Sequence, residues 1–172
     1  AITIAGAGAD DKAIQAALQE ACRKASLLSG IPEQIDRDGS LWFGTFQDGL
    51  VRMKDGHYTV YRQAGSGLGT DDVWALAELP DGRIAIGTLG SGLQLLTPST
   101  GRFTTINTHN SNLTSDYIAS LSLMKDGRLV LGHSQGISIL YIRTRKAVNI
   151  GPSPVNGVRL SSLSVNQVYV GS

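Results

Sequence analysis

The sequence has little of what holds small domains together by covalent bonds or metals. A single cysteine, Cys22, stands among 172 residues, which excludes an intrachain disulfide and a cysteine-rich zinc site. The three histidines, His57, His109 and His133, are far apart and lack the spacing of metal ligands. We therefore expect neither a metal ion nor a cofactor.

Neither sign of charge dominates, since 15 basic side chains face 14 acidic ones and the formal net charge is +1. No basic stripe follows the chain, which argues against a nucleic-acid partner. Although 41% of the residues are hydrophobic, no apolar run approaches the ~20 residues of a membrane-spanning helix. The serines lack a nucleophile-elbow sequence, and no other catalytic constellation is present. We therefore expect that the protein is not an enzyme.

Glycine is abundant, with 21 residues, and the glycines recur in register. Three segments, 36–45, 79–88 and 124–133, align without gaps. Each carries an Asp-Gly pair, at 38–39, 81–82 and 126–127, so the spacings are 43 and 45 residues. A fixed period of 40–50 residues is typical of β-propeller blades, whereas a β-sandwich would not repeat at this length.

The second copy predicts four short strands, at 73–79, 83–88, 93–96 and 102–106. Asp-Gly between apolar runs is a hairpin signal, because both residues tolerate the positive φ of tight turns. The predicted fold is therefore all-β, with about three four-stranded antiparallel blades. Closed propellers have about four to eight blades, so we expect an incomplete propeller that meets neighbouring blades of a larger chain or associates with itself.

The ends of the chain differ from the repeats. Residues 1–30 predict a strand followed by a helix, capped by Asp10 or Asp11, and residues 31–172 carry the blades. A weaker copy begins at 156–160, and 167–172 resembles another second strand of a blade.

The pattern Asp-x-Asp-Gly-x-Leu-Trp-x-Gly-Thr, followed by Gly-Leu, is best matched at 36–50 and 79–93. It resembles the two-component regulator propeller repeat, and the resemblance covers roughly 35–172. The third copy departs, with His133 in place of threonine and Gly136-Ile137 in place of Gly-Leu. The resemblance implies a periplasmic sensor region of a bacterial hybrid histidine kinase, many of which respond to oligosaccharides.

Alternating strand directions place the loops after the second and fourth strands at one end of the blades. There we expect a ligand site, because rings can stack on sugar faces and carboxylates or amides can bind hydroxyl groups. The candidate ligand-binding residues are Gln47, Asp48, Asp71, Asp72, Asp116 and Tyr117. The alternative is that these loops are solvated turns, with the aspartates capping backbone N–H groups and Tyr117 packing.

Other conspicuous residues have structural explanations. Asp38, Asp81 and Asp126 occupy one blade position, so turn chemistry explains them better than acid–base catalysis does. Trp42 and Trp74 lie within strands, which favours packing between blades over ligand stacking.

The leading functional hypothesis is an extracytoplasmic, periplasmic sensor module that binds a small polar ligand, preferably a carbohydrate. A protein-interaction scaffold without a small ligand is the second hypothesis. A polysaccharide lyase is the third hypothesis. It depends on a short likeness of residues 8–18 to pectate-lyase-like proteins and on the fact that some propellers are lyases.

Overall fold

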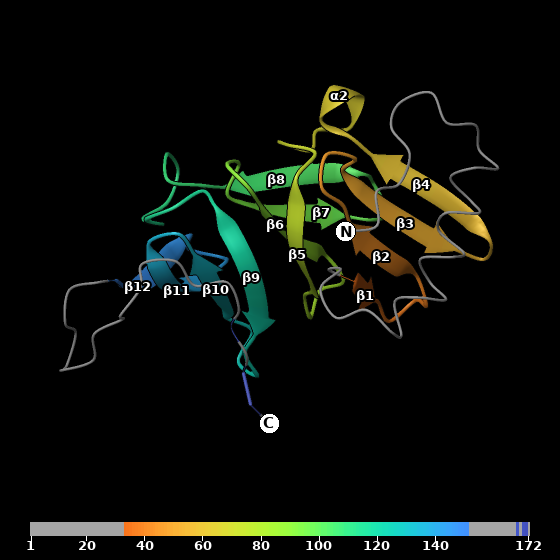
Figure 1. Cartoon of the computed structure of the whole chain (residues 1–172). Coiled ribbons are helices and arrows are strands. Elements are labelled where there is room, and N and C mark those ends of the chain that lie inside the picture. The colour runs from red at the N-terminus through yellow and green to blue at the C-terminus, as the bar shows by residue number, and fades with distance from the viewer. Residues whose placement is uncertain (1–32, 152–167, 169, 172) are drawn as a thin grey trace.

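The computed structural model describes residues 33–151, 168, 170 and 171. Three four-stranded antiparallel sheets follow one another along the chain and lie side by side (Figure 1). Within each sheet every strand pairs with the next one in sequence. The prediction of three propeller blades is thereby confirmed.

The strands of the first blade are β1 (Glu33–Ile35), β2 (Leu41–Gly44), β3 (Leu50–Lys54) and β4 (His57–Tyr61). A four-residue helix, α2 (Gln63–Ser66), leads to the second blade. That blade comprises β5 (Val73–Glu78), β6 (Ile84–Thr88), β7 (Leu93–Thr97) and β8 (Arg102–Ile106). The third comprises β9 (Ile118–Leu123), β10 (Leu129–His133), β11 (Gly136–Tyr141) and β12 (Lys146–Ile150). The strands expected in the second blade match the observed ones to within one residue at each end.

Three expectations concern parts of the chain outside the described residues. These are the strand and helix of 1–30, the additional copy at 156–160, and most of the strand at 167–172, of which Val168, Val170 and Gly171 alone are described.

The Asp-Gly turns have one hydrogen-bond pattern in all three blades. In the second blade the Leu79 N–H donates to the Arg83 carbonyl, and the Leu79 carbonyl accepts the Gly82 N–H. Asp36 and Met124 make the same two bonds in the other blades. Gly82 has φ of 84°, and its counterparts Gly39 and Gly127 have 80° and 85°, a region that favours glycine. The Asp81 carboxylate accepts the Arg83 N–H at 3.1 Å. The turn role of these aspartates is confirmed.

In the second and third blades an arginine follows the Asp-Gly turn and lowers the pKa of the turn aspartate. Hydrogen bonding from Arg83 lowers the pKa of Asp81, and hydrogen bonding from Arg128 lowers the pKa of Asp126. Both carboxylates are therefore ionised at neutral pH.

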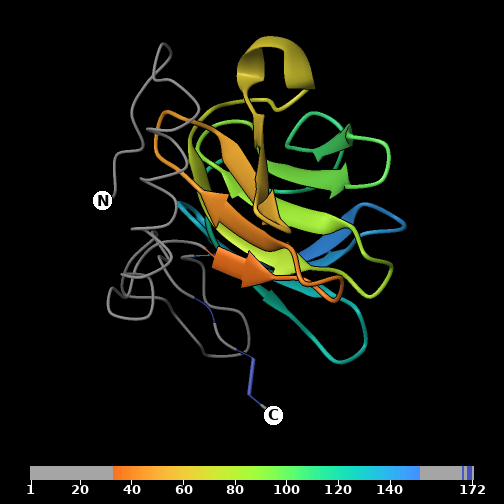
Figure 2. The same ribbon diagram turned by 90° about the vertical axis from the view of Figure 1, so that its right-hand side faces the viewer.

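Alternate residues of each strand face opposite sides of the blade, so the second blade packs against the first with one face and against the third with the other. Figure 2 shows the blades from the side. Between the first two blades the buried core consists of Trp42, Leu50, Leu68, Val73, Ile84, Ile86 and Leu96. Between the second and third, Ala85, Leu93 and Leu95 meet Leu129, Leu131 and Leu140. Trp42 is fully buried, which confirms its predicted place between blades.

The far face of the third blade is the exception to this burial. On the second blade the face toward the next blade is formed by Ala85, Leu93, Leu95 and Ile106, all of them buried. The strand registers give the third blade the matching set Val130, Ile137, Ile139 and Ile150, all of them half-buried. Within the described part of the chain, this apolar face has no fourth blade against it.

His133 replaces a threonine that does the same task in the other two blades. Thr45 and Thr88 accept a backbone N–H from the following loop through their hydroxyl groups. The His133 Nδ1 atom instead accepts the Gln135 N–H at 3.1 Å, so its proton lies on Nε2, which is 2.8 Å from the Ser138 hydroxyl. The ring is fully buried.

Burial lowers the pKa of His133, so this blade should lose stability in mild acid. A folded-state pKa below the unfolded value of ~6.5 means that the neutral ring stabilises the fold above that pH. The stabilisation is lost as pH falls, because a second ring proton would oppose the Gln135 N–H. We expect the free energy of unfolding, measured in urea, to drop between about pH 7.5 and pH 5.5.

His133→Thr is the matched control, because it restores the residue of the other blades and removes the titrating ring. The variant should show a shallower pH dependence over the same interval. An equal slope in both proteins would contradict the assignment.

Candidate functional site: the loop face

One end of the blades is formed by the loops between the second and third strands and by the segments that enter the first strands. We call this end the loop face and the end with the Asp-Gly turns the hairpin face. Backbone hydrogen bonds join the loops of neighbouring blades: Val73 N–H donates to the Thr45 carbonyl at 2.9 Å, and Gly92 N–H to the Asp116 carbonyl at 2.9 Å. The expectation that these loops share one face is confirmed.

Asp71 and Asp116 occupy the same position in successive blades and hold the same kind of contact. The Asp71 carboxylate accepts the Gln63 N–H at 2.6 Å. The Asp116 carboxylate accepts both the N–H of Thr108, at 2.8 Å, and its hydroxyl, at 2.9 Å. Both side chains are half-buried, and each fixes the loop that precedes it. These contacts are those expected of capping residues.

Asp72, Gln47 and Asp48 form the adjoining part of the loop face. Gln47 lies in the left-handed region with φ of 74°, and its N–H donates to the Asp72 carboxylate at 2.9 Å. Asp48 is buried and pairs with the Arg62 guanidinium at 3.0 Å. The Gln47 side chain is exposed. The structure therefore brings these three residues together, but the carboxylates of Asp72 and Asp48 already bind protein groups.

Three large aromatic side chains at this end of the blades are exposed to solvent. Phe46, Trp74 and Tyr117 are 54%, 45% and 56% exposed. Tyr117 pairs with Leu89 in an isolated β-bridge. A β-carbon on Gly90 would stand 3.9 Å from the Tyr117 ring, so the ring lies along the neighbouring blade's loop.

Trp74 corrects the sequence prediction, which placed it between blades. The pairing of β5 with β6 shifts register between Val73 and Ala75, which leaves Trp74 as an unpaired bulge residue. A bulge re-aims a side chain relative to the regular pleat, and Trp74 consequently points to solvent while Val73 and Ala75 are buried. Nothing in the local sequence signals this bulge.

The described part of the chain contains neither a cluster of metal ligands nor a helix that could span a membrane. No group of three or more histidine, cysteine or acidic side chains is close enough to hold a metal ion there. None of the described helices is long and apolar enough to cross a membrane.

Comparisons with known proteins agree on the fold. No protein-family model and no curated protein matches the sequence. Among solved structures, the extracellular domain of a putative hybrid two-component system from B. thetaiotaomicron is 28% identical, with a TM-score of 0.60. A putative one-component system from the same organism is 17% identical, with a TM-score of 0.57, and virginiamycin B lyase from Staphylococcus aureus is 17% identical, with a TM-score of 0.53.

These matches cover most of this chain but a small part of the other proteins. They span 80%, 70% and 74% of this chain, against 17%, 18% and 43% of the three solved chains in the same order. The two matches below 25% identity show the propeller fold, and the first adds likeness in sequence. The described part of the chain is thus built of three β-propeller blades that resemble those in the extracellular domain of a hybrid two-component system.

Proposed function

We propose that these blades belong to an extracytoplasmic sensor domain of a bacterial two-component signalling protein. The support is the likeness to the B. thetaiotaomicron extracellular domain at 28% identity, together with the repeat pattern. Periplasmic placement is part of the same proposal, as is the absence of catalytic activity. The half-buried outer face of the third blade supports contact with further blades or with a second copy, and that expectation stays a prediction.

We further propose that the loop face binds the signal, a small polar ligand of the carbohydrate class. The observation that carries this proposal is the exposure of Phe46, Trp74 and Tyr117 on one face of a protein whose aromatic content is 6%. Flat rings bind the apolar faces of sugars by stacking. The rigid β strands beneath the rings keep the entropy lost on binding small.

A glycan array followed by calorimetry would test this proposal. Trp74→Ala and Tyr117→Ala should each weaken binding of a glycan found in this way by about tenfold, because a buried aromatic contact contributes on the order of 1–2 kcal/mol. Tyr141→Ala is the matched control: Tyr141 is 45% exposed but lies at the end of β11 on the hairpin face. Unchanged affinity in both loop-face variants would overturn the site.

Asp116→Asn separates ligand contact from a structural role in the same assay. Because its carboxylate already accepts two hydrogen bonds from Thr108, we expect the variant to lower the melting temperature and to leave glycan affinity within about twofold of the parent. A large loss of affinity with an unchanged melting temperature would place Asp116 in the ligand site.

One observation favours a protein-interaction scaffold as the second candidate. The carboxylates of Asp71, Asp72 and Asp116 all accept hydrogen bonds from protein groups. The loop face therefore presents aromatic rings but few free acceptors for the hydroxyl groups of a sugar. A glycan screen without any binding, combined with a partner protein whose affinity falls in Trp74→Ala, would favour this second function.

A further inference from the structure

A polar cleft of about 520 Å³ opens on the hairpin face, at the seam between the first and second blades. Its walls come from the β1–β2 turn, the β5–β6 turn, the β7–β8 turn and the middle of β3. The side chains that matter for its chemistry are Arg37, Asp38, Arg52, Asp81 and Arg83. Its volume lies in the range of small-molecule sites.

This seam breaks the apolar pattern of the repeat. Arg52 pairs with Trp42 across β2 and β3, and the equivalent pairs are Ala85 with Leu95 and Val130 with Ile139. Arg52 therefore stands where the other two blades carry Leu95 and Ile139. Its guanidinium lies 5.2 Å from the centre of the Trp42 ring. A charged group in a position that repeats as apolar indicates a role other than packing.

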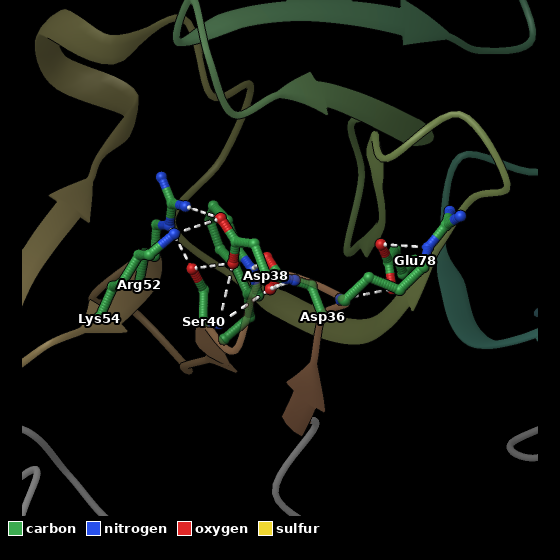
Figure 3. A network of polar contacts seen from close by, with 8 residues as sticks. Asp36, Asp38, Ser40, Arg52, Lys54 and Glu78 are labelled. Carbon is green, nitrogen blue, oxygen red and sulfur yellow. Dashed lines mark hydrogen bonds and ion pairs between the residues drawn. The ribbon is translucent and has the colours of Figure 1, made fainter.

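Asp38 holds Arg52 and Lys54 at the edge of the cleft (Figure 3). One carboxylate oxygen accepts Arg52 Nη2 at 2.8 Å and Lys54 Nζ at 2.7 Å. The other accepts the N–H and hydroxyl of Ser40 at 2.9 and 2.6 Å. Interaction with the Asp36 side chain, and then hydrogen bonds from Lys54 and Ser40, hold the pKa of Asp38 well below its usual range. Its acceptor capacity is filled.

A clasp on the other wall fixes the two blades together. Glu78 accepts both the backbone N–H of Arg37, at 3.1 Å, and its Nε, at 3.0 Å. Arg37 Nη2 also donates to the Leu79 carbonyl at 2.7 Å. The equivalent of Glu78 in the third blade is Leu123. This clasp therefore holds Arg37 at the edge of the cleft, where its side chain is 63% exposed.

The cleft is lined by three arginines and by four carboxylates, those of Asp36, Asp38, Glu78 and Asp81. Arg37, Arg52 and Arg83 each use Nε and Nη2 for contacts with the protein, and the Nη1 group of each has no acceptor among the described residues. The carboxylates of Asp38, Glu78 and Asp81 are occupied by these arginines and their neighbours. The hydrogen-bonding capacity that stays open in the cleft is therefore that of the three Nη1 groups, and planar guanidinium groups match oxyanions in geometry.

We propose that this cleft binds the oxyanion group of a small ligand: a carboxylate, a sulfate or a phosphate. Arg52 and Arg83 approach the group from the two blades and Arg37 from the clasp, so a bound anion would connect the blades across their seam. The site lies on the opposite face from the proposed glycan site and does not depend on it.

The test uses the whole chain and four probes: sodium sulfate, inorganic phosphate, glucuronate and neutral glucose. We expect the three anions to raise the melting temperature above that in sodium chloride of equal ionic strength, and glucose to have no effect. A response to glucuronate alone would assign the site to acidic sugars. Because sulfate and phosphate also stabilise proteins by exclusion from the surface, a response to them assigns the site to free anions only if Arg83→Gln removes it. Identical melting temperatures in all salts would overturn the proposal.

Arg83→Gln and Arg128→Gln form a matched pair of variants. Both arginines follow an Asp-Gly turn and bind its aspartate at 2.7 Å, but Arg83 alone of the two lines the cleft. Arg83→Gln should weaken binding of the responding anion, measured by calorimetry, by about tenfold, as one charge-assisted hydrogen bond warrants. Arg128→Gln should leave binding unchanged.

Arg52→Leu is a second variant, which places at this position the residue of the second blade. We expect it to weaken anion binding as Arg83→Gln does. If it does not fold, Arg83→Gln still decides the matter. Equal weakening in Arg83→Gln and Arg128→Gln would reduce the effect to general surface charge and contradict a cleft site. Tyr117→Ala should bind the anion like the parent, so failure of the loop-face proposal and failure of this one are distinguishable.

Discussion

Replacing Trp42 by alanine should lower the free energy of unfolding by about 3–5 kcal/mol, the usual cost of emptying a large aromatic site in a core. Trp42 is fully buried between the first two blades. Its ring stacks near Tyr61, with centroids 6.1 Å apart, and lies beneath the Arg52 guanidinium. The variant loses these contacts together, and urea denaturation would measure the loss.

The hydrogen bond of Trp42 adds to the effect of its size. Its Nε1 donates to the Asp36 carboxylate at 2.7 Å, and Asp36 is itself buried. Trp42→Phe keeps most of the ring and removes the donor, so it should cost about 1–3 kcal/mol, the price of one unsatisfied buried acceptor. A value near zero would show that Asp36 finds another partner.

Trp74→Ala is the control for both variants, because the chain contains two tryptophans and they differ in exposure. Substitutions on the surface usually change stability by about 0.5 kcal/mol or less. Equal losses in Trp42→Ala and Trp74→Ala would contradict the assignment of Trp42 to the core between blades.

The fold could be predicted because its strongest signals are local and repeat. Asp81-Gly82 sets a turn by its own backbone preferences, and the same pair at 38–39 and 126–127 fixes the blade period. The aligned Asp-Gly segments place β6 to within one residue, and alternation places the neighbouring strands. No knowledge of long-range contacts is needed for this step.

The candidate site was less predictable because its properties arise between blades. The sequence placed Asp116 and Tyr117 on the correct face, but it could not show that Thr108 already occupies the Asp116 carboxylate. Trp74 was misplaced because a one-residue bulge turns its side chain to solvent and shifts the alternation of the residues that follow it. Arg52 can be identified as unusual only when the strand pairings are known, because they show that it occupies the position of Leu95 in the second blade.

Gly92→Ala should destabilise the protein by about 2–5 kcal/mol, since two costs add. Gly92 has φ of 74°, and a residue with a β-carbon in this region destabilises the fold by about 1–2 kcal/mol. Its new β-carbon would also lie 2.6 Å from the Ile106 carbonyl oxygen and 3.0 Å from the Asn107 side chain. Relief of such overlap by backbone movement typically costs about 1–3 kcal/mol.

The position repeats, which makes the effect a property of the blade and not of one loop. Gly49 immediately precedes β3 and Gly136 is the first residue of β11, and a β-carbon on them would overlap the carbonyls of Tyr61 and Ile150. The chain at Gly92 cannot move away without loss, because its N–H donates to the Asp116 carbonyl at 2.9 Å and its carbonyl accepts the Thr88 hydroxyl at 2.7 Å.

Gly82→Ala isolates the conformational part of this cost. Gly82 has φ of 84°, and a β-carbon there would meet nothing within 4 Å, so the expected loss is about 1–2 kcal/mol. The difference between the two variants in urea denaturation measures the close approach of the third and fourth strands at the loop face. If the two variants lose the same free energy, the third strand has room for a side chain at its start, and the tight approach that we describe is wrong.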